Sequence, residues 1–263
     1  MGKVVEDLKK KFNQAVGAKI EQKTEERNNE EYKSFIRAEA MKLNNMFEEA
    51  IDEYKKVLKL NPHHLEAMRG LGIVYKYSSE NEKALEIFKK AINEMPFDKV
   101  MYNEAASCCI KLNRAEEAKA LLKKAIKLDK EYSEAHFNLA LAHEILEENE
   151  LAFKVYTKLI EIRPSYIPAY NNLGSLHLRE GDPKEALKVF KKILKINPEF
   201  LKAILGAALS YDKLGEFSLA SRYYKKYLEK KPSSDNAVYI NERLEDIAMK
   251  KSSKSHAKLT LVK

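Results

Sequence analysis

Apolar residues recur along most of the chain at helical spacing. Over residues 170–177 they form one stripe on a helix with 3.6 residues per turn, and this stripe consists of Tyr170, Leu173, Gly174 and His177. A second stripe follows at Ala186, Phe190 and Ile193. The turn-forming residues Gly181, Asp182 and Pro183 lie between the two stripes. This pattern predicts two antiparallel helices joined by a tight turn, each with one apolar face.

The same pattern returns every 34 residues and predicts six gapless blocks. These blocks are 31–64, 65–98, 99–132, 133–166, 167–200 and 201–234. Position 20 of each block is an alanine: Ala50, Ala84, Ala118, Ala152, Ala186 and Ala220. Five of the seven prolines lie at position 32, where they end the second helix by removing an N–H donor. A single helix pair cannot cover its apolar stripe, so we expect the blocks to stack on their neighbours.

These blocks resemble the tetratricopeptide repeat family. MRGLGIVY at 68–75 is followed by Ala84, Phe88 and Pro96, and YNNLGSLH at 170–177 is followed by the equivalent Ala, Phe and Pro. The resemblance implies an all-α fold, a right-handed α-solenoid of stacked antiparallel helix pairs. It also implies a concave groove, lined by the first helix of each pair, that holds extended or helical peptides.

The two ends of the chain depart from the repeat. Residues 1–30 are predicted to form an amphipathic helix, with a stripe from Val5 to Ile20, followed by a charged linker. We expect this helix to fold back onto Phe35 and Ile36 in the first block. Residues 235–250 are predicted to form a capping helix, and the basic residues 251–263 a disordered tail.

Candidate ligand contacts follow from the face of each first helix that is opposite its apolar stripe. Side-chain amides on this face both donate and accept hydrogen bonds, so Asn138 and Asn172, at the same position of adjacent blocks, are predicted to hold a peptide backbone. The predicted groove consists of Arg69, Lys76, Tyr77, Asn103, Glu104, Ser107, Lys111, Asn138, Leu141, Glu144, Asn171, Asn172, Ser175, Arg179 and Lys202. The alternative is a solvated polar face without a ligand.

The charge of the chain does not favour a nucleic-acid groove. The net charge is +8, but the residues opposite the apolar stripe carry seven positive and six negative side chains. Nucleic acid requires a field of one sign and aromatic stacking platforms. We therefore interpret the excess positive charge as a determinant of solubility, located on the other exposed faces.

No residue pattern favours catalysis or a bound cofactor. The chain lacks phosphate-binding glycine loops, the nucleophile elbow and the zinc-protease motif. Cys109, His143 and His177 share position 11 of successive blocks, but stacked helices lie about 8–10 Å apart, too far for one metal ion. The adjacent Cys108 and Cys109 lack the spacing of a redox pair. We therefore expect no enzyme activity, no metal, no cofactor and no small-molecule substrate.

The leading hypothesis is a cytoplasmic scaffold or adaptor that binds a protein or peptide in its groove. The two cysteines cannot staple a fold, and the sequence shows neither a signal peptide nor a membrane span. One alternative is an adaptor that contacts a membrane surface or nucleic acid through the basic segments 3–20 and 250–263. Another is a targeting subunit of a separate enzyme.

Overall fold

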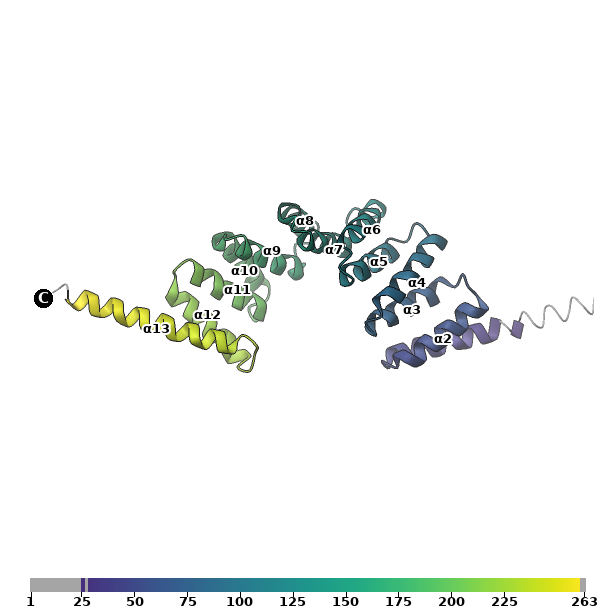
Figure 1. The fold of residues 1–263 in the computed structure, drawn as a ribbon, viewed down its shortest axis with the longest axis horizontal. Helices are drawn as coiled ribbons and strands as arrows, with labels where there is room; N and C mark the ends of the chain where they lie inside the picture. Colours follow the sequence, from purple (N-terminus) through teal and green to yellow (C-terminus); the bar gives the residue numbers. More distant parts are fainter. Residues whose placement is uncertain (1–24, 27, 261–263) are drawn as a thin grey trace, which may run out of the picture. The chain divides into compact units, whose positions relative to one another are not determined.

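The computed structural model describes residues 25–26 and 28–260, and it is all-α over these residues. The amphipathic helix predicted over residues 3–20 lies outside them. A first helix covers residues 28–43. The helices that follow are α2 (Phe47–Leu60), α3 (Leu65–Tyr77), α4 (Asn81–Glu94), α5 (Lys99–Lys111), α6 (Ala115–Leu128), α7 (Ser133–Ile145), α8 (Asn149–Ile162), α9 (Ile167–Arg179), α10 (Pro183–Ile196), α11 (Leu201–Lys213), α12 (Phe217–Lys230) and α13 (Ala237–Thr260) (Figure 1). The predicted fold class, stacked helix pairs without strands in the described ranges, is confirmed.

The helices form two compact units, Met1–Leu146 and Glu147–Lys263. Unit 1 contains the first helix and α2 to α7, and unit 2 contains α8 to α13. Within each unit, helices that follow one another in the chain pack together, for example α5 against α4 and α6, and α11 against α10 and α12. The division lies inside the predicted fourth block, 133–166, since α7 packs on α6 and α5 whereas α8 packs on α9.

A left-handed residue lies in the turn between the two helices of every predicted block. These residues are spaced by 34 and all occupy position 15: Asn45, Ser79, Asn113, Glu147, Gly181 and Gly215, with φ between 57° and 80°. Glycine adopts this conformation without a steric penalty, and asparagine tolerates it better than other residues with a Cβ. The turn is thus built identically from six different local sequences.

The core of each unit consists of small residues where helices cross and large rings between them. The alanines at position 20 are all completely buried. The ring four residues later is also buried: Tyr54, Phe88, Tyr156, Phe190 and Tyr224 are each 0–1% exposed. Burying one such side chain stabilises a fold by about 1.5–3 kcal/mol. The small residues bring the helix backbones close together, and the rings fill the remaining volume.

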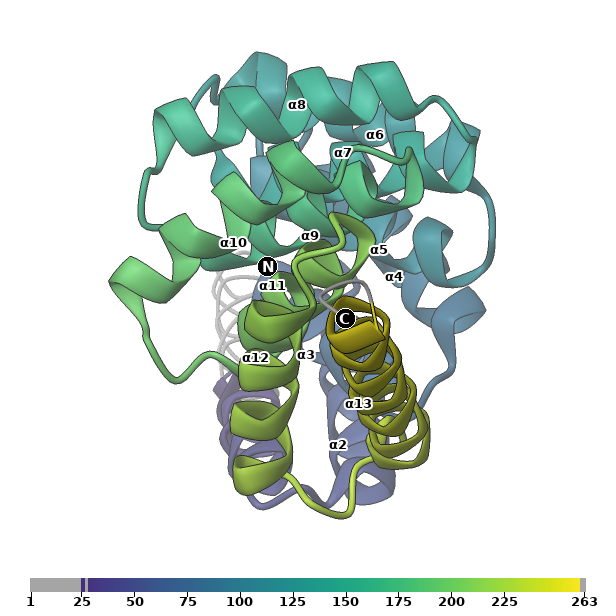
Figure 2. The ribbon, with the colours of Figure 1, turned by 90° about the vertical axis from the view of Figure 1, so that its left-hand side faces the viewer.

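The C-terminal helix is longer than predicted. Its first part buries Ile240 and Ile247 in one cluster with Tyr224 and Tyr227 of α12, and Figure 2 shows α13 alongside α12. The helix then continues to Thr260, past the predicted end at residue 250. The segment predicted to be a disordered tail is therefore helical up to Thr260, since residues 251–260 contain neither Gly nor Pro to end the helix.

Candidate peptide-binding surface

The predicted ligand contacts of unit 1 lie on α3, α5 and α7, the first helices of their pairs. We call this set stripe 1; it consists of Arg69, Lys76, Tyr77, Asn103, Glu104, Ser107, Lys111, Asn138, Leu141 and Glu144. Each of these helices turns its alanines and large apolar residues toward its neighbours, so most polar residues of stripe 1 stay at the surface. They are fixed by packed helices rather than by loops, which favours a preformed surface.

Side chains of stripe 1 bind one another across adjacent repeats. Lys76 on α3 donates to Glu104 on α5 at 2.5 Å, and both side chains are about three-quarters covered. Arg69 forms an ion pair with Asp98 at 2.9 Å, and the same aspartate caps α5 by accepting hydrogen bonds from the Val100 and Met101 amides. These contacts hold α3 and α5 in register.

Asn103 differs from the prediction, because it is only 5% exposed. Its amide oxygen accepts a hydrogen bond from Nδ2 of Asn138 at 2.8 Å. Position 5 of α5 faces the neighbouring helix α7, and this contact buries the side chain. Asn103 therefore links two repeats. Asn138 is half-buried and keeps one amide N–H and its oxygen for a ligand, since only one of its donors is used in this contact.

Four further side chains of stripe 1 are at least partly accessible. Lys111 is exposed, and it forms no ion pair with any residue in the described part of the chain. Tyr77 is 65% exposed, and its ring stacks on Phe47 with centroids 5.5 Å apart. Ser107 and Leu141 are half-buried. Together they offer a cation, two hydroxyl groups and an apolar contact on three neighbouring helices.

In unit 2 the predicted contacts lie on α9 and α11. Asn172 donates to the Tyr156 hydroxyl at 3.0 Å and accepts a hydrogen bond from Asn171 at 3.3 Å. Ser175 is half-buried, whereas Arg179 and Lys202 are exposed. Asn138 belongs to unit 1 and Asn172 to unit 2, and their predicted joint contact with one peptide backbone stays a prediction.

The first repeat places Phe35 differently from the sequence-based expectation. Phe35 was expected to be covered by the N-terminal helix, but residues of its own repeat already half-bury it: its ring lies 4.8 Å from that of His64 and 6.4 Å from that of Tyr54. It is drawn into the repeat because both rings border its position. Ile36 is 47% exposed. The partner expected for it, the helix over 3–20, lies outside the described residues.

A buried carboxylate in unit 2 was not singled out from the sequence. Asp212 on α11, with a side chain 8% exposed, accepts two hydrogen bonds from Arg243 on α13 at 2.7 and 2.8 Å and one from the Tyr224 hydroxyl at 3.2 Å. The hydrogen bonds that Arg243 donates to Asp212 raise the pKa of its guanidinium. The sequence signal was that Asp212 is the single acidic residue of α11.

The cysteine and histidine residues at position 11 are packing residues. Cys108 and Cys109 are fully buried free thiols. Burial raises the pKa of Cys108 to about 12 and that of Cys109 to about 11, which disfavours the nucleophilic thiolate. His143 is 6% exposed, and His177 packs on Phe153 at 4.6 Å.

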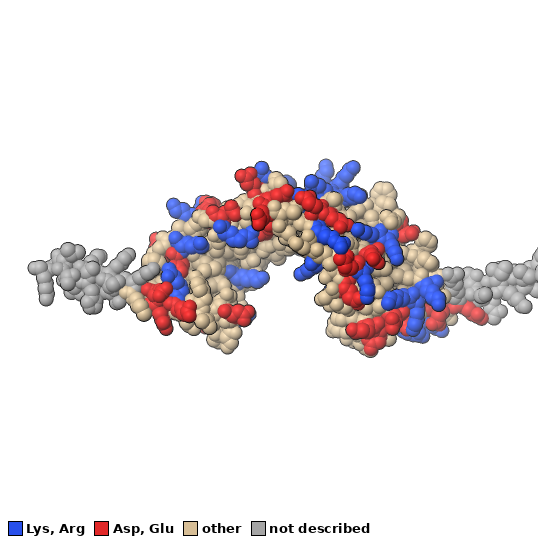
Figure 3. Space-filling model, in the orientation of Figure 1, with Lys and Arg blue, Asp and Glu red and all other residues tan. Residues whose placement is uncertain are grey.

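Charges of both signs are scattered among uncharged surface on the visible face of each unit (Figure 3). Charged side chains also pair across neighbouring repeats, as in Lys89 with Glu117 at 2.6 Å and Arg114 with Glu82 at 2.7 Å. Among the residues with described positions, no group of three or more His, Cys, Asp or Glu is arranged to hold a metal ion. None of the described helices combines the length and apolar character that crossing a bilayer requires.

Comparison with protein families gives a consistent result over more than half of the chain. Models of the tetratricopeptide repeat match residues 39–99, 110–167 and 167–200. A peroxisomal targeting signal receptor of Kluyveromyces lactis is 29% identical over 99 residues, which cover 37% of this chain and 18% of the receptor. The chain therefore spans less than a fifth of that relative.

Solved structures support the same architecture. A crystal structure of MamA protein is 28% identical, with a TM-score of 0.59, and the alignment covers 64% of this chain and 92% of that one. The structure of PilW, a type IV pilus biogenesis factor, is 21% identical with a TM-score of 0.71, covering 80% of this chain and 97% of PilW. At that identity the similarity to PilW concerns the fold.

Proposed function

We propose that this chain, which belongs to the tetratricopeptide repeat family, is a non-enzymatic scaffold that binds a segment of a partner protein on stripe 1. The membership supports a role in protein interaction. The observation that carries the finer assignment is the set of accessible polar groups on α3, α5 and α7, which packed helices hold in fixed positions. Two reduced thiols, Cys108 and Cys109, are consistent with a cytoplasmic location.

The chemistry of stripe 1 favours a peptide over a small molecule. Lys111 offers a positive charge to an acidic side chain or a terminal carboxylate. Asn138 offers one donor and one acceptor, the pair of groups that a peptide bond also carries. Leu141 supplies an apolar contact between them. These groups lie on α5 and α7, so a ligand that reaches all of them is an extended chain or a helix.

The experiment is affinity capture with the full chain and its Lys111→Glu variant, followed by mapping of the bound segment of the recovered partner. Lys111 is exposed and forms no ion pair with a described residue, so reversing its charge leaves the fold intact. The matched control is Lys123→Glu on α6, which is also exposed and lies in the same unit. We expect Lys111→Glu to lose the partner and Lys123→Glu to retain it.

Asn138→Ala provides a second test, read together with a thermal melt because Asn138 also bonds Asn103. If the partner stays bound to Lys111→Glu but is lost from Lys123→Glu, the binding surface lies on the second helices and the assignment to stripe 1 is wrong.

A further inference from the structure

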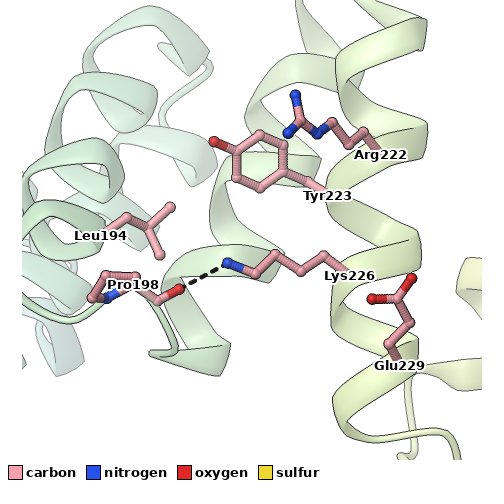
Figure 4. A pocket seen from close by; sticks show the side chains of 6 residues that line it. All are labelled: Leu194, Pro198, Arg222, Tyr223, Lys226 and Glu229. Carbon is pink, nitrogen blue, oxygen red and sulfur yellow. Dashed lines mark hydrogen bonds between the residues drawn. The ribbon is translucent and has the colours of Figure 1, made fainter.

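Unit 2 contains a second candidate surface, a recess between α12 and the end of α10 (Figure 4). Its volume is about 550 Å³, within the range of about 300–1,000 Å³ typical of ligand pockets. Its walls consist of Leu194, Pro198, Arg222, Tyr223, Lys226 and Glu229. None of these residues belongs to the predicted groove, because α10 and α12 are the second helices of their pairs.

The positive charge of the chain is concentrated on these two helices. α10 and α12 together carry nine basic residues and two acidic ones. The other second helices carry less positive charge: α4 and α8 are balanced, α2 has three lysines and four acidic residues, and α6 has four lysines and two glutamates. The location of these charges therefore argues against solubility as their only role. A local field of one sign attracts ligands of the opposite sign.

Of the two basic side chains that line the recess, Lys226 is bonded within the fold and Arg222 is available to a ligand. Lys226 donates to the Pro198 carbonyl at 3.0 Å and lies 3.4 Å from Glu199, so it fixes the loop after α10. Arg222 is exposed, and within the described ranges it has no ion pair. The Tyr223 ring packs at a tilt of 39° against the ring of Tyr211, with centroids 5.4 Å apart, and this contact holds the wall of the recess in place.

The walls combine this charge with an apolar floor. Leu194 and Tyr223 are half-buried, and Figure 4 shows Leu194 and Pro198 on the α10 side facing Tyr223 and Lys226 on α12. Such a recess holds an aliphatic side chain, while Arg222 binds a carboxylate beside it. We propose that it is a docking site for an acidic peptide segment with a single aliphatic residue among Asp and Glu.

The composition of the recess distinguishes this ligand from other polyanions. Nucleic acid binds through aromatic stacking platforms, and the one aromatic ring in the lining, Tyr223, already contacts the ring of Tyr211. A membrane surface requires protruding apolar side chains next to basic ones. Here Leu194 lies in the recess.

The test uses the full chain and a fluorescein-labelled peptide with one central Leu flanked by Asp and Glu, measured by fluorescence anisotropy. We expect Arg222→Glu to weaken binding by about tenfold. Glu229→Gln removes the repelling charge and is expected to strengthen binding by about twofold to threefold. Because Glu229→Gln improves binding, misfolding cannot explain its effect. Replacing the central Leu of the peptide with Gly is expected to weaken binding in all variants.

Lys154→Glu on α8 is the matched control, since it reverses an exposed charge in the same unit outside the recess. The proposal is overturned if Lys154→Glu weakens binding as much as Arg222→Glu, or if neither variant does. It is also overturned if single-stranded oligothymidylate or phosphatidylserine vesicles bind more tightly than the peptide and are equally sensitive to Arg222→Glu. Circular dichroism melts confirm that all variants are folded.

Discussion

The ring of Phe190 occupies the space that a side chain at Gly206 would need. A Cβ placed on Gly206 would lie 2.4 Å from Cζ of this ring, and one on Gly174 would lie 2.8 Å from the same atom. Phe190 on α10 is thus enclosed by α9 and α11 and is only 1% exposed. The relationship recurs in unit 1, where Gly70 lies against the ring of Tyr54.

Gly206→Ala is expected to destabilise the protein, although alanine is the better helix former. The gain in helix propensity is about 1 kcal/mol, whereas overpacking a full core costs about 1–3 kcal/mol. Because the buried ring of Phe190 cannot move aside, the steric cost prevails. Urea unfolding followed by circular dichroism measures the difference. Phe190→Leu should relieve the penalty, and a more stable Gly206→Ala in the unmodified background would contradict the packing described.

Asn138→Leu is expected to cost about 1–3 kcal/mol, because it leaves the buried amide oxygen of Asn103 without a donor. The double variant Asn103→Leu and Asn138→Leu removes both polar groups and should be less destabilised than the single one. Thermal melts of the unmodified protein, both single variants and the double variant test this order. A double variant with the summed cost of both single changes would show that the Asn103–Asn138 bond contributes nothing.

Arg243→Ala is expected to destabilise unit 2 by about 3 kcal/mol, because it leaves the covered carboxylate of Asp212 without its cation. Hydrogen exchange should then be faster in α12 and α13, the helices next to this ion pair. Glu245→Ala, an exposed change on α13, is the control. Unchanged exchange in Arg243→Ala would mean that the ion pair does not fasten α13.

We expect the two buried thiols to make the protein less stable at alkaline pH. Both have a pKa above the ordinary value of 9.0, about 12 for Cys108 and about 11 for Cys109. The fold keeps them protonated while the unfolded chain releases their protons, so their contribution is complete below pH 9 and disappears as pH rises through 11 to 12. Unfolding measured from pH 8 upward, with Cys108→Ala and Cys109→Ala combined as the comparison, should show a shallower decline in the double variant.

Reaction with a thiol reagent gives an independent measurement of the same burial. At pH 8 we expect both cysteines to react slowly in the native protein and rapidly in urea. Fast labelling of the native protein would contradict the packing of Cys108 and Cys109.

The helix pairs could be predicted because alanine at position 20 and, in five of the six blocks, proline at position 32 recur every 34 residues, and this period sets the boundaries of the blocks. The contacts between the ring at position 24 of one block and the first helix of the next block could not be predicted. Gly206 and Asn172 both occupy position 6, which on an isolated helix faces solvent. In the stacked array the first packs on Phe190 and the second bonds Tyr156. Only the arrangement of adjacent repeats brings these residues together.

The same reason explains the differences in the candidate sites. Asn103 was assigned to the open face from its helix alone, and its burial comes from α7. The recess beside Arg222 combines residues of two helices and a loop, and no periodicity of one segment indicates it. The left-handed turns could be predicted from the sequence only in part, because Gly181 and Gly215 are typical of this conformation and Glu147 is not.

Because all six blocks share the same left-handed turn, segments of one repeat length can replace one another. Since the backbone reverses at the same position of each block, 34-residue segments that run from one of these turns to the next can be exchanged, duplicated or removed without a change in loop length. A library of recombined repeats would then carry stripe 1 and the recess beside Arg222 in new combinations. The molecule is a ready source of modules for designed binding proteins.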